Sequence, residues 1–177
     1  SGRDVRRAHF TPDELAKGFD LMYRAGAVYG LFLCSGIAGA VHTMDEMLAT
    51  VELLRSTYAF RGYVHLKILP DAEPDQIVRA VRLADRVSAN LEAPTPETLA
   101  NLAPLKRLAA VTTPLRAAAD AIRAERERGG PPARDGVGRG RLGISTQFVV
   151  GPAGETDRDL LTIVQELNQD VGFARVY

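Results

Sequence analysis

The chain has 177 residues, of which 46% are hydrophobic, and its 22 basic residues balance 22 acidic ones. A chain of this size and apolar content can bury one substantial core, which excludes an intrinsically disordered protein, and the zero net charge gives no general reason to expect a polyanionic partner. No run approaches the roughly 18 apolar residues of a membrane helix, and residues 1–10 lack the pattern of a signal peptide. We therefore expect one domain over residues 1–177 that is soluble and cytoplasmic, without a membrane partner.

Helix and strand patterns alternate along the chain. The expected helices run from Pro12 to about Arg24, from a capping box at Thr43–Glu46, over about 74–84, from about Pro96, over 114–128 and from the Thr156 cap. The expected strands are 28–34, 62–69, 86–91, 144–150 and 173–177. This alternation predicts an α/β fold with a parallel sheet built from right-handed βα units, open or closing toward a TIM-like barrel.

The ends of the chain and one internal segment modify this picture. The sequence begins with a helix pattern and ends with a strand pattern. In a barrel-like order this predicts a partial (β/α) barrel that lacks its first strand and was cut from a longer protein. Residues 129–140, GGPPARDGVGRG, are rich in glycine and proline, and we expect them to form a flexible loop.

The stretch from Leu142 to Asp159 combines a strand, a glycine turn and a capped helix. Its apolar run over 144–150 is typical of a strand buried on both faces. Ligands of parallel α/β sheets bind at the carboxyl ends of strands, so chemistry is expected there first. The helix that follows is expected to bury Leu160, Leu161, Ile163, Val164 and Leu167.

Polar residues gather near the carboxyl ends of the expected strands. Leaving such groups buried without partners costs about 1–3 kcal/mol each, so we expect a polar ligand to satisfy them together. The alternative is that they pair with one another or with water. The set comprises Cys34, Ser35, Gly36, His65, Lys67, Ser88, Asn90, Glu92, Ser145, Thr146 and Gln147.

Three residues near these strand ends each have two possible interpretations. Lys67 shares a strand face with His65, and an inward lysine is expected to meet a phosphate or carboxylate, whereas an outward one is solvated. Glu155 either favours the helix N-terminus through the dipole or has free amides beside it that hold an anion. Cys34 is interpreted as a buried apolar residue rather than a nucleophile.

Four segments together resemble the radical S-adenosylmethionine superfamily, and more narrowly its biotin-synthase-related subgroup described as DNA modification or repair proteins. The segments are LFLCSG, GYVHLKILP, ADRVSANLEAPTPETL and STQFVVGPAGETDRD. The resemblance implies a partial (β/α) barrel that holds a four-iron four-sulfur cluster and S-adenosylmethionine at the carboxyl ends of its strands. Reductive cleavage of S-adenosylmethionine would then give a 5′-deoxyadenosyl radical that abstracts a substrate hydrogen.

The resemblance also implies roles for individual positions. The backbone of Cys34, Ser35 and Gly36 would meet the methionine amino group, and Asn90 and Glu92 would meet the ribose or carboxylate. The segment from Val149 to Glu155 would lie near adenine, with Gly151 allowing close approach. Gln147 would lie on the inward face, and His65 and Lys67 would face the methionine moiety or the substrate.

One motif of the family is absent. The sequence has no Cys-x-x-x-Cys-x-x-Cys, and a single cysteine cannot hold a cluster, so no metal site is expected in this chain. We expect the cluster cysteines upstream of Ser1 and expect the chain alone to be inactive. The intact enzyme would need an electron donor such as flavodoxin or ferredoxin. A nucleic-acid substrate rests on the subgroup's description, since the chain has no basic stripe.

Two other functions stay open at this stage. One is an aldolase-like or phosphate-binding (β/α) barrel enzyme in which Lys67 forms a Schiff base with a carbonyl substrate. The other is a non-catalytic ligand-binding barrel module in which the inward polar groups pair with one another.

Overall fold

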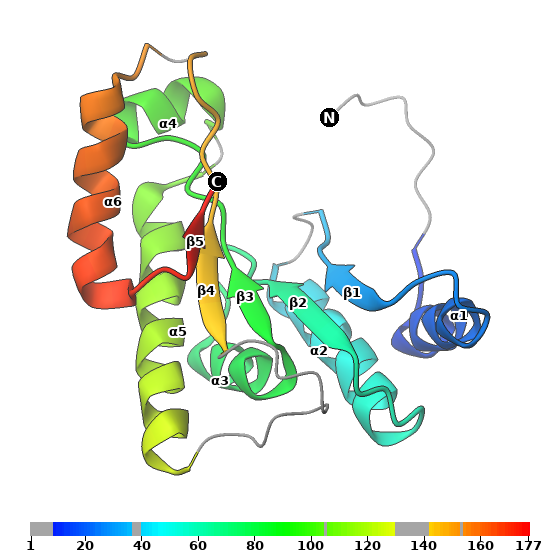
Figure 1. Cartoon of the computed structure of the whole chain (residues 1–177). Helices are drawn as coiled ribbons and strands as arrows, with labels where there is room; N and C mark the ends of the chain where they lie inside the picture. Colours follow the sequence, from blue (N-terminus) through cyan, green and yellow to red (C-terminus); the bar gives the residue numbers. More distant parts are fainter. Residues whose placement is uncertain (1–8, 37–39, 105, 130–141, 153) are drawn as a thin grey trace.

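The computed structural model describes residues 9–36, 40–104, 106–129, 142–152 and 154–177. These residues include one parallel sheet whose spatial order β1-β2-β3-β4-β5 follows the chain (Figure 1). Its strands are β1 (Gly30–Leu33), β2 (Tyr63–Lys67), β3 (Arg86–Ser88), β4 (Gly143–Thr146) and β5 (Arg175–Val176). The α/β prediction with a parallel sheet is therefore confirmed. The loop expected over 129–140 lies, apart from Gly129, outside the described residues.

Helices occupy the connections between the strands, as a parallel sheet requires. Successive helices pack side by side in the order α1, α2, α3, α5 and α6. Capping boxes start α1 at Thr11 and α6 at Thr156, as the sequence predicts. The helices are α1 (Pro12–Arg24), α2 (Ala40–Ser56), α3 (Pro74–Leu83), α4 (Pro96–Leu102), α5 (Leu108–Glu127) and α6 (Asp157–Val171).

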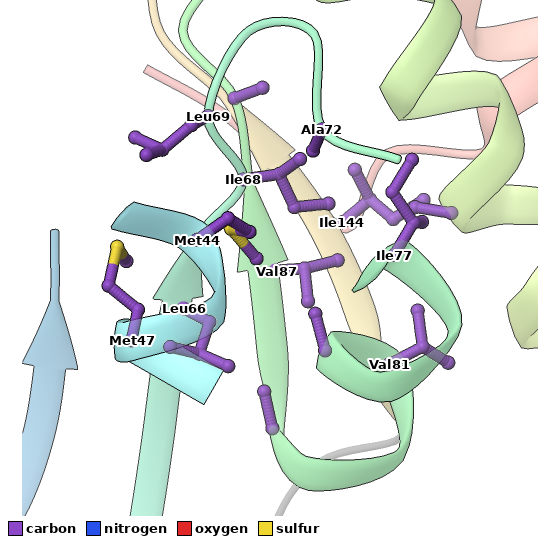
Figure 2. Close-up of a cluster of buried hydrophobic side chains, with 14 of the residues drawn as sticks. Met44, Met47, Leu66, Ile68, Leu69, Ala72, Ile77, Val81, Val87 and Ile144 are labelled. Atoms are coloured by element: carbon purple, nitrogen blue, oxygen red, sulfur yellow. The ribbon is translucent and has the colours of Figure 1, made fainter. Parts of the chain in front are cut away.

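The core lies between the sheet and these helices. Alternate strand residues point toward it, because successive side chains of a strand lie on opposite faces. Figure 2 shows strand residues from three strands meeting side chains of α2 and α3. Burying each such side chain contributes about 1.5–3 kcal/mol relative to leaving it exposed. The labelled examples are Leu66, Val87 and Ile144 from the strands, and Met44, Met47, Ile77 and Val81 from the helices.

Two predicted helix starts are wrong. α2 already begins at Ala40, so Thr43 lies inside the helix and does not cap it. Met44, fully buried in the core, lies in the second turn of this longer helix. α5 begins at Leu108 and contains Pro114 in its interior, because burial of Val111 and Leu115 outweighs the loss of the hydrogen bond that the proline cannot donate.

The strand predicted over 144–150 is shorter than expected. β4 ends at Thr146, and the sheet continues beyond it in one parallel bridge between Glu92 and Phe148. Val149 and Val150 are consequently exposed rather than buried. Leu161, expected on the buried side of α6, is also exposed, whereas Leu167 is buried.

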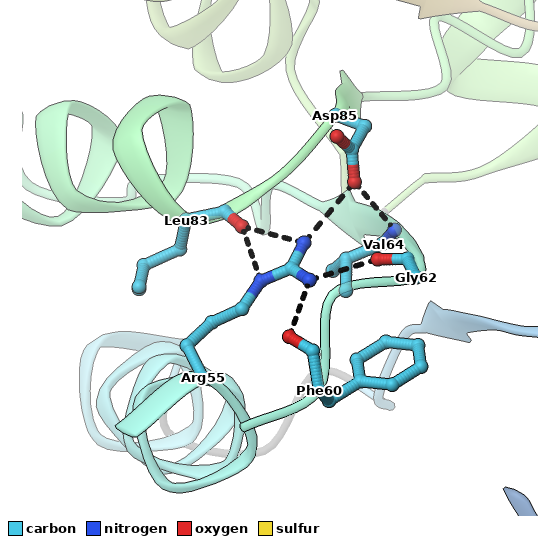
Figure 3. A network of polar contacts seen from close by, with 6 residues as sticks. All are labelled: Arg55, Phe60, Gly62, Val64, Leu83 and Asp85. Atoms are coloured by element: carbon cyan, nitrogen blue, oxygen red, sulfur yellow. Dashed lines mark hydrogen bonds and ion pairs between the residues drawn. The ribbon is translucent and has the colours of Figure 1, made fainter. Parts of the chain in front are cut away.

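A buried arginine joins four segments of the fold (Figure 3). The guanidinium of Arg55, at the end of α2, donates to the carbonyls of Phe60 at 2.9 Å, Gly62 at 2.8 Å and Leu83 at 3.2 Å. It also donates to Asp85 Oδ2 at 3.1 Å, and this same oxygen accepts the Val64 N–H at 2.8 Å. The arginine thereby ties the end of α2 to the start of β2, the end of α3 and the start of β3.

Replacing Arg55 should be far more destabilising than replacing a more exposed arginine. The Arg55 side chain is 9% exposed, so Arg55→Met leaves buried carbonyls and Asp85 without their donor, and we expect a loss of about 3–5 kcal/mol. The matched control is Arg79→Met, because Arg79 pairs with Asp45 and Glu52 but is 36% exposed, and we expect about 1 kcal/mol or less there. Urea denaturation measures both. Equal losses in the two variants would contradict a structural role specific to Arg55.

Candidate functional site

The sheet has a second face that points away from the helix-packed core, and we call it the polar face. Strand register arranges its side chains in rows, because paired residues of parallel strands point to the same side. One row joins Phe32, His65, Arg86 and Gly143, and the next joins Lys67, Ser88, Ser145 and Arg175. Tyr63 lies on the same face, two residues before His65.

His65 lies at the centre of the polar face. Its Nε2 is 2.8 Å from Ser88 Oγ, and its ring stacks on Phe32 with a centroid distance of 4.4 Å. Burial, and then the positive charges of Arg86 and Lys67, lower the pKa of His65 from 6.5 to about 4. The imidazole is therefore neutral at neutral pH. Part of the predicted polar set is thus paired internally, through the bond between His65 and Ser88.

Arg86 lies on this face and was not among the site residues predicted from the sequence. Its Nη1 atom is buried and has no hydrogen-bond partner among the described residues. Ligands were expected at the carboxyl ends of the strands, whereas Arg86 is the first residue of β3. A signal was available, since an arginine at the start of an otherwise apolar strand needs a partner if it is buried.

The carboxyl edge of the sheet brings together the second group of predicted residues. Glu92 adopts a left-handed backbone conformation with φ 68°, which ends the alternation expected along its strand. Its N–H donates to the Gln147 carbonyl at 3.0 Å, and its own carbonyl accepts the Val149 N–H at 2.8 Å. The segments after β3 and β4 therefore lie side by side at this edge.

The polar side chains at this edge differ in whether they have a hydrogen-bond partner. Lys106 Nζ donates to Glu92 Oε1 at 2.7 Å, and both side chains are largely buried. The lysine lies on the connection between α4 and α5, so the pairing was not visible in sequence, although lysine is rare in this chain. Asn90 is half-buried, and its amide makes no hydrogen bond within the described part of the chain. The Gln147 side chain is exposed.

The glycine turn after β4 is held by a hydrogen bond within the turn. Gly151 and Gly154 have φ values of 103° and 75°, which favour glycine. The Gly151 N–H donates to the carboxylate of Glu155, so that side chain holds the turn ahead of α6. This arrangement agrees with a local structural role for Glu155 at the start of the helix.

Cys34, Ser35 and Gly36 follow the edge strand β1 and are all exposed. The expectation of a buried Cys34 is wrong, because the strand ends at Leu33 and the chain leaves the sheet there. These residues border the carboxyl end of β2, since Leu33 pairs with Leu66. The structure thus forms two groups: the polar face around His65 and Lys67, and the carboxyl edge around Asn90 and Glu92.

A hollow of about 180 Å³ lies elsewhere, between α5, α6 and the start of β4. Its lining includes Arg123 and Asp170, but none of the predicted site residues. We therefore place the candidate site by the convergence of polar side chains and strand ends rather than by this hollow.

No protein-family model matches the chain, and no curated protein matches it either. The described residues contain no group of three or more His, Cys, Asp or Glu side chains placed to hold a metal ion. None of the described helices combines the length and apolar character needed to cross a membrane.

His65 should make the protein less stable as the pH falls. Its folded pKa of about 4 lies below its ordinary 6.5, so between these values the unfolded chain takes up a proton that the folded chain does not. The free energy of unfolding therefore decreases as the pH falls through this window. His65→Gln cannot titrate and should flatten the decrease, whereas the exposed His42→Gln should not. Urea denaturation at several pH values measures this, and an unchanged pH dependence in His65→Gln would refute it.

Proposed function

We propose that the chain is the barrel body of a radical S-adenosylmethionine enzyme, as its four strand-end segments imply by resemblance. A sheet of consecutive parallel strands with a helix in each connection is the arrangement from which partial (β/α) barrels are built, and the observed strand order supports this interpretation. In this proposal the barrel's first strand and the cluster ligands belong to a segment outside the 177 residues.

The observation that carries the proposal is the contact between the two segments whose resemblance is most specific. The residues after β3 and those after β4 are joined by the hydrogen bonds of Glu92 with Gln147 and Val149. They meet at the carboxyl edge, where parallel α/β sheets bind their ligands. The parallel pairing of β3 with β4 brings both segments to this edge, where the proposed cofactor would contact them together.

The residues at this edge fit the cofactor that the resemblance implies. Asn90 offers an amide donor and acceptor without a competing side-chain partner, which suits a ribose hydroxyl or a carboxylate. Gly151 has no side chain and would let a flat ring approach the backbone. Glu92, held by Lys106, positions the segment that follows β3. Ser35 and Gly36 would contribute backbone groups.

The cluster does not fit this chain alone, since Cys34 is the sole cysteine of the sequence. When bound together, the cluster and S-adenosylmethionine supply a 5′-deoxyadenosyl radical that abstracts a substrate hydrogen. This chain's own residues would bind and orient the cofactor and the substrate. An electron donor such as flavodoxin or ferredoxin, a cytoplasmic location and a nucleic-acid substrate also belong to this proposal.

A longer version of the protein should bind the cluster. We expect the segment before Ser1 to contain Cys-x-x-x-Cys-x-x-Cys, because the family's cluster needs three cysteine ligands and leaves one iron for the cofactor. After anaerobic reconstitution with iron and sulfide, the extended protein should show the visible charge-transfer absorption of such clusters. With a reductant it should cleave S-adenosylmethionine to 5′-deoxyadenosine and methionine. An upstream segment without these cysteines would refute the assignment.

In the reconstituted protein, Asn90→Ala should lower the affinity for S-adenosylmethionine about tenfold, the effect of losing one well-made hydrogen bond. Asn101→Ala is the matched control, because Asn101 is exposed on α4 and should not affect binding. Equilibrium binding of the cofactor to each variant measures the difference. Equal affinities in the two variants would remove Asn90 from the cofactor site.

A further inference from the structure

All charged side chains of the five strands are positive. None of the five strands contains an aspartate or glutamate, yet the polar face carries three cations, in a chain whose net charge is zero. The cations are Lys67 of β2, Arg86 of β3 and Arg175 of β5. Arg175 lies over the ring of Tyr177 at 5.7 Å, whereas Lys67 and Arg86 have no such contact among the described residues.

Lys67 and Arg86 are unusual among the partly buried cations of the fold. Arg55, Arg79 and Lys106 each pair with at least one carboxylate. Lys67 and Arg86 make no ion pair within the described chain, and the buried Nη1 of Arg86 lacks even a hydrogen-bond acceptor. An unsatisfied, buried guanidinium N–H costs free energy, so this arrangement favours an acceptor that binds from outside the chain.

The strand register places the two cations around one spot. His65 pairs with Arg86 across the sheet, and Lys67 follows His65 by two residues on the same face. Both cations act on the His65 imidazole, since each lowers its pKa. Gly143 pairs with Arg86 on the other side and adds no side chain there. Phe32, which is 58% exposed, stacks on His65 and adds a flat apolar surface beside the charges.

We propose that the polar face between β2 and β3 binds the phosphate group of a small phosphorylated ligand, with Arg86 and Lys67 as its donors. Two cations without a counter-charge match a dianion, and a guanidinium presents paired N–H groups that fit phosphate oxygens. The Phe32 ring would contact the sugar or base attached to the phosphate. S-adenosylmethionine has no phosphate, and this site lies on the strand rows rather than at the carboxyl edge, so of the two roles that the resemblance allowed for Lys67 it takes contact with the substrate. The identity of the ligand as the enzyme's substrate rests on the proposed function, but the anion site itself does not.

The test uses the 177-residue chain without a cluster. It is titrated with inorganic phosphate, a nucleoside monophosphate, the matching nucleoside, ribose 5-phosphate and succinate, while NMR follows the His65 ring signals. Phosphate and both phosphate esters should shift these signals and raise the pKa of His65, because a bound anion offsets the charges of Arg86 and Lys67. The nucleoside should not. Tighter binding of the nucleotide than of ribose 5-phosphate would assign the Phe32 surface to a base, and the reverse order would assign it to the sugar.

Variants test the two donors directly. Arg86→Gln and Lys67→Gln should each weaken phosphate binding at least tenfold, and Arg86→Lys should retain part of it. The control Arg116→Gln, an exposed arginine on α5 paired with Asp170, should bind as the parent does. Lys67 has no partner in the described chain, so Lys67→Gln should remain folded and provides the decisive variant if Arg86→Gln unfolds.

Three results would overturn the phosphate site: no response of His65 to any phosphate ligand, equal binding in Lys67→Gln and Arg116→Gln, or succinate binding as tightly as phosphate. Because Asn90→Ala should leave phosphate binding unchanged, a failure here is distinct from a failure of the cofactor proposal. A chain that binds phosphate while its extended form lacks a cluster would retain the anion site and lose the radical enzyme assignment.

Discussion

The guanidinium of Arg55 helps to fix the register of β3 against β2, on which the arrangement of the polar face depends. Through Asp85 it is bonded to the start of β3, and the same carboxylate accepts the Val64 N–H of β2. If β3 slipped by one residue, Arg86 would turn into the helix-packed core and Val87 would turn out to the polar face. A buried charge without a partner costs far more than the loss of one apolar contact. The ion pair between Arg55 and Asp85 therefore helps to keep the Arg86 side chain on the polar face.

Most of the element order was predictable from sequence, because its signals are local. The Thr11 and Thr156 capping boxes lie within single turns of chain, and so does the glycine turn at Gly151. The predictions at Thr43 and Pro114 failed because nearby side chains are buried against distant parts of the core, and both helices begin before the local signal. Local pattern thus identifies the elements, while packing decides where they begin.

The candidate site was predictable in part for the same reason. The positions of strand ends and the alternation of strand residues predicted His65, Lys67, Asn90 and Glu92 as site residues. In the structure they form two neighbouring groups, on the polar face and at the carboxyl edge. The Glu92 to Lys106 pair was hidden, since it joins a strand end to a loop after another helix. Such a pair depends on tertiary placement, which no periodicity in the sequence encodes.

The two groups lie along one strand direction, and this order has a chemical consequence. β3 runs from Arg86 to Ser88, and Asn90 follows two residues later, on the side of the carboxyl edge. A ligand whose phosphate binds Arg86 would extend along β3 toward the carboxyl edge, where the cofactor is proposed to lie. Holding the charged end of a ligand fixes the position of its uncharged end without requiring contacts to the reacting carbon. A hydrogen-abstracting site benefits from such remote anchoring, because a C–H bond itself offers almost nothing for a protein to bind.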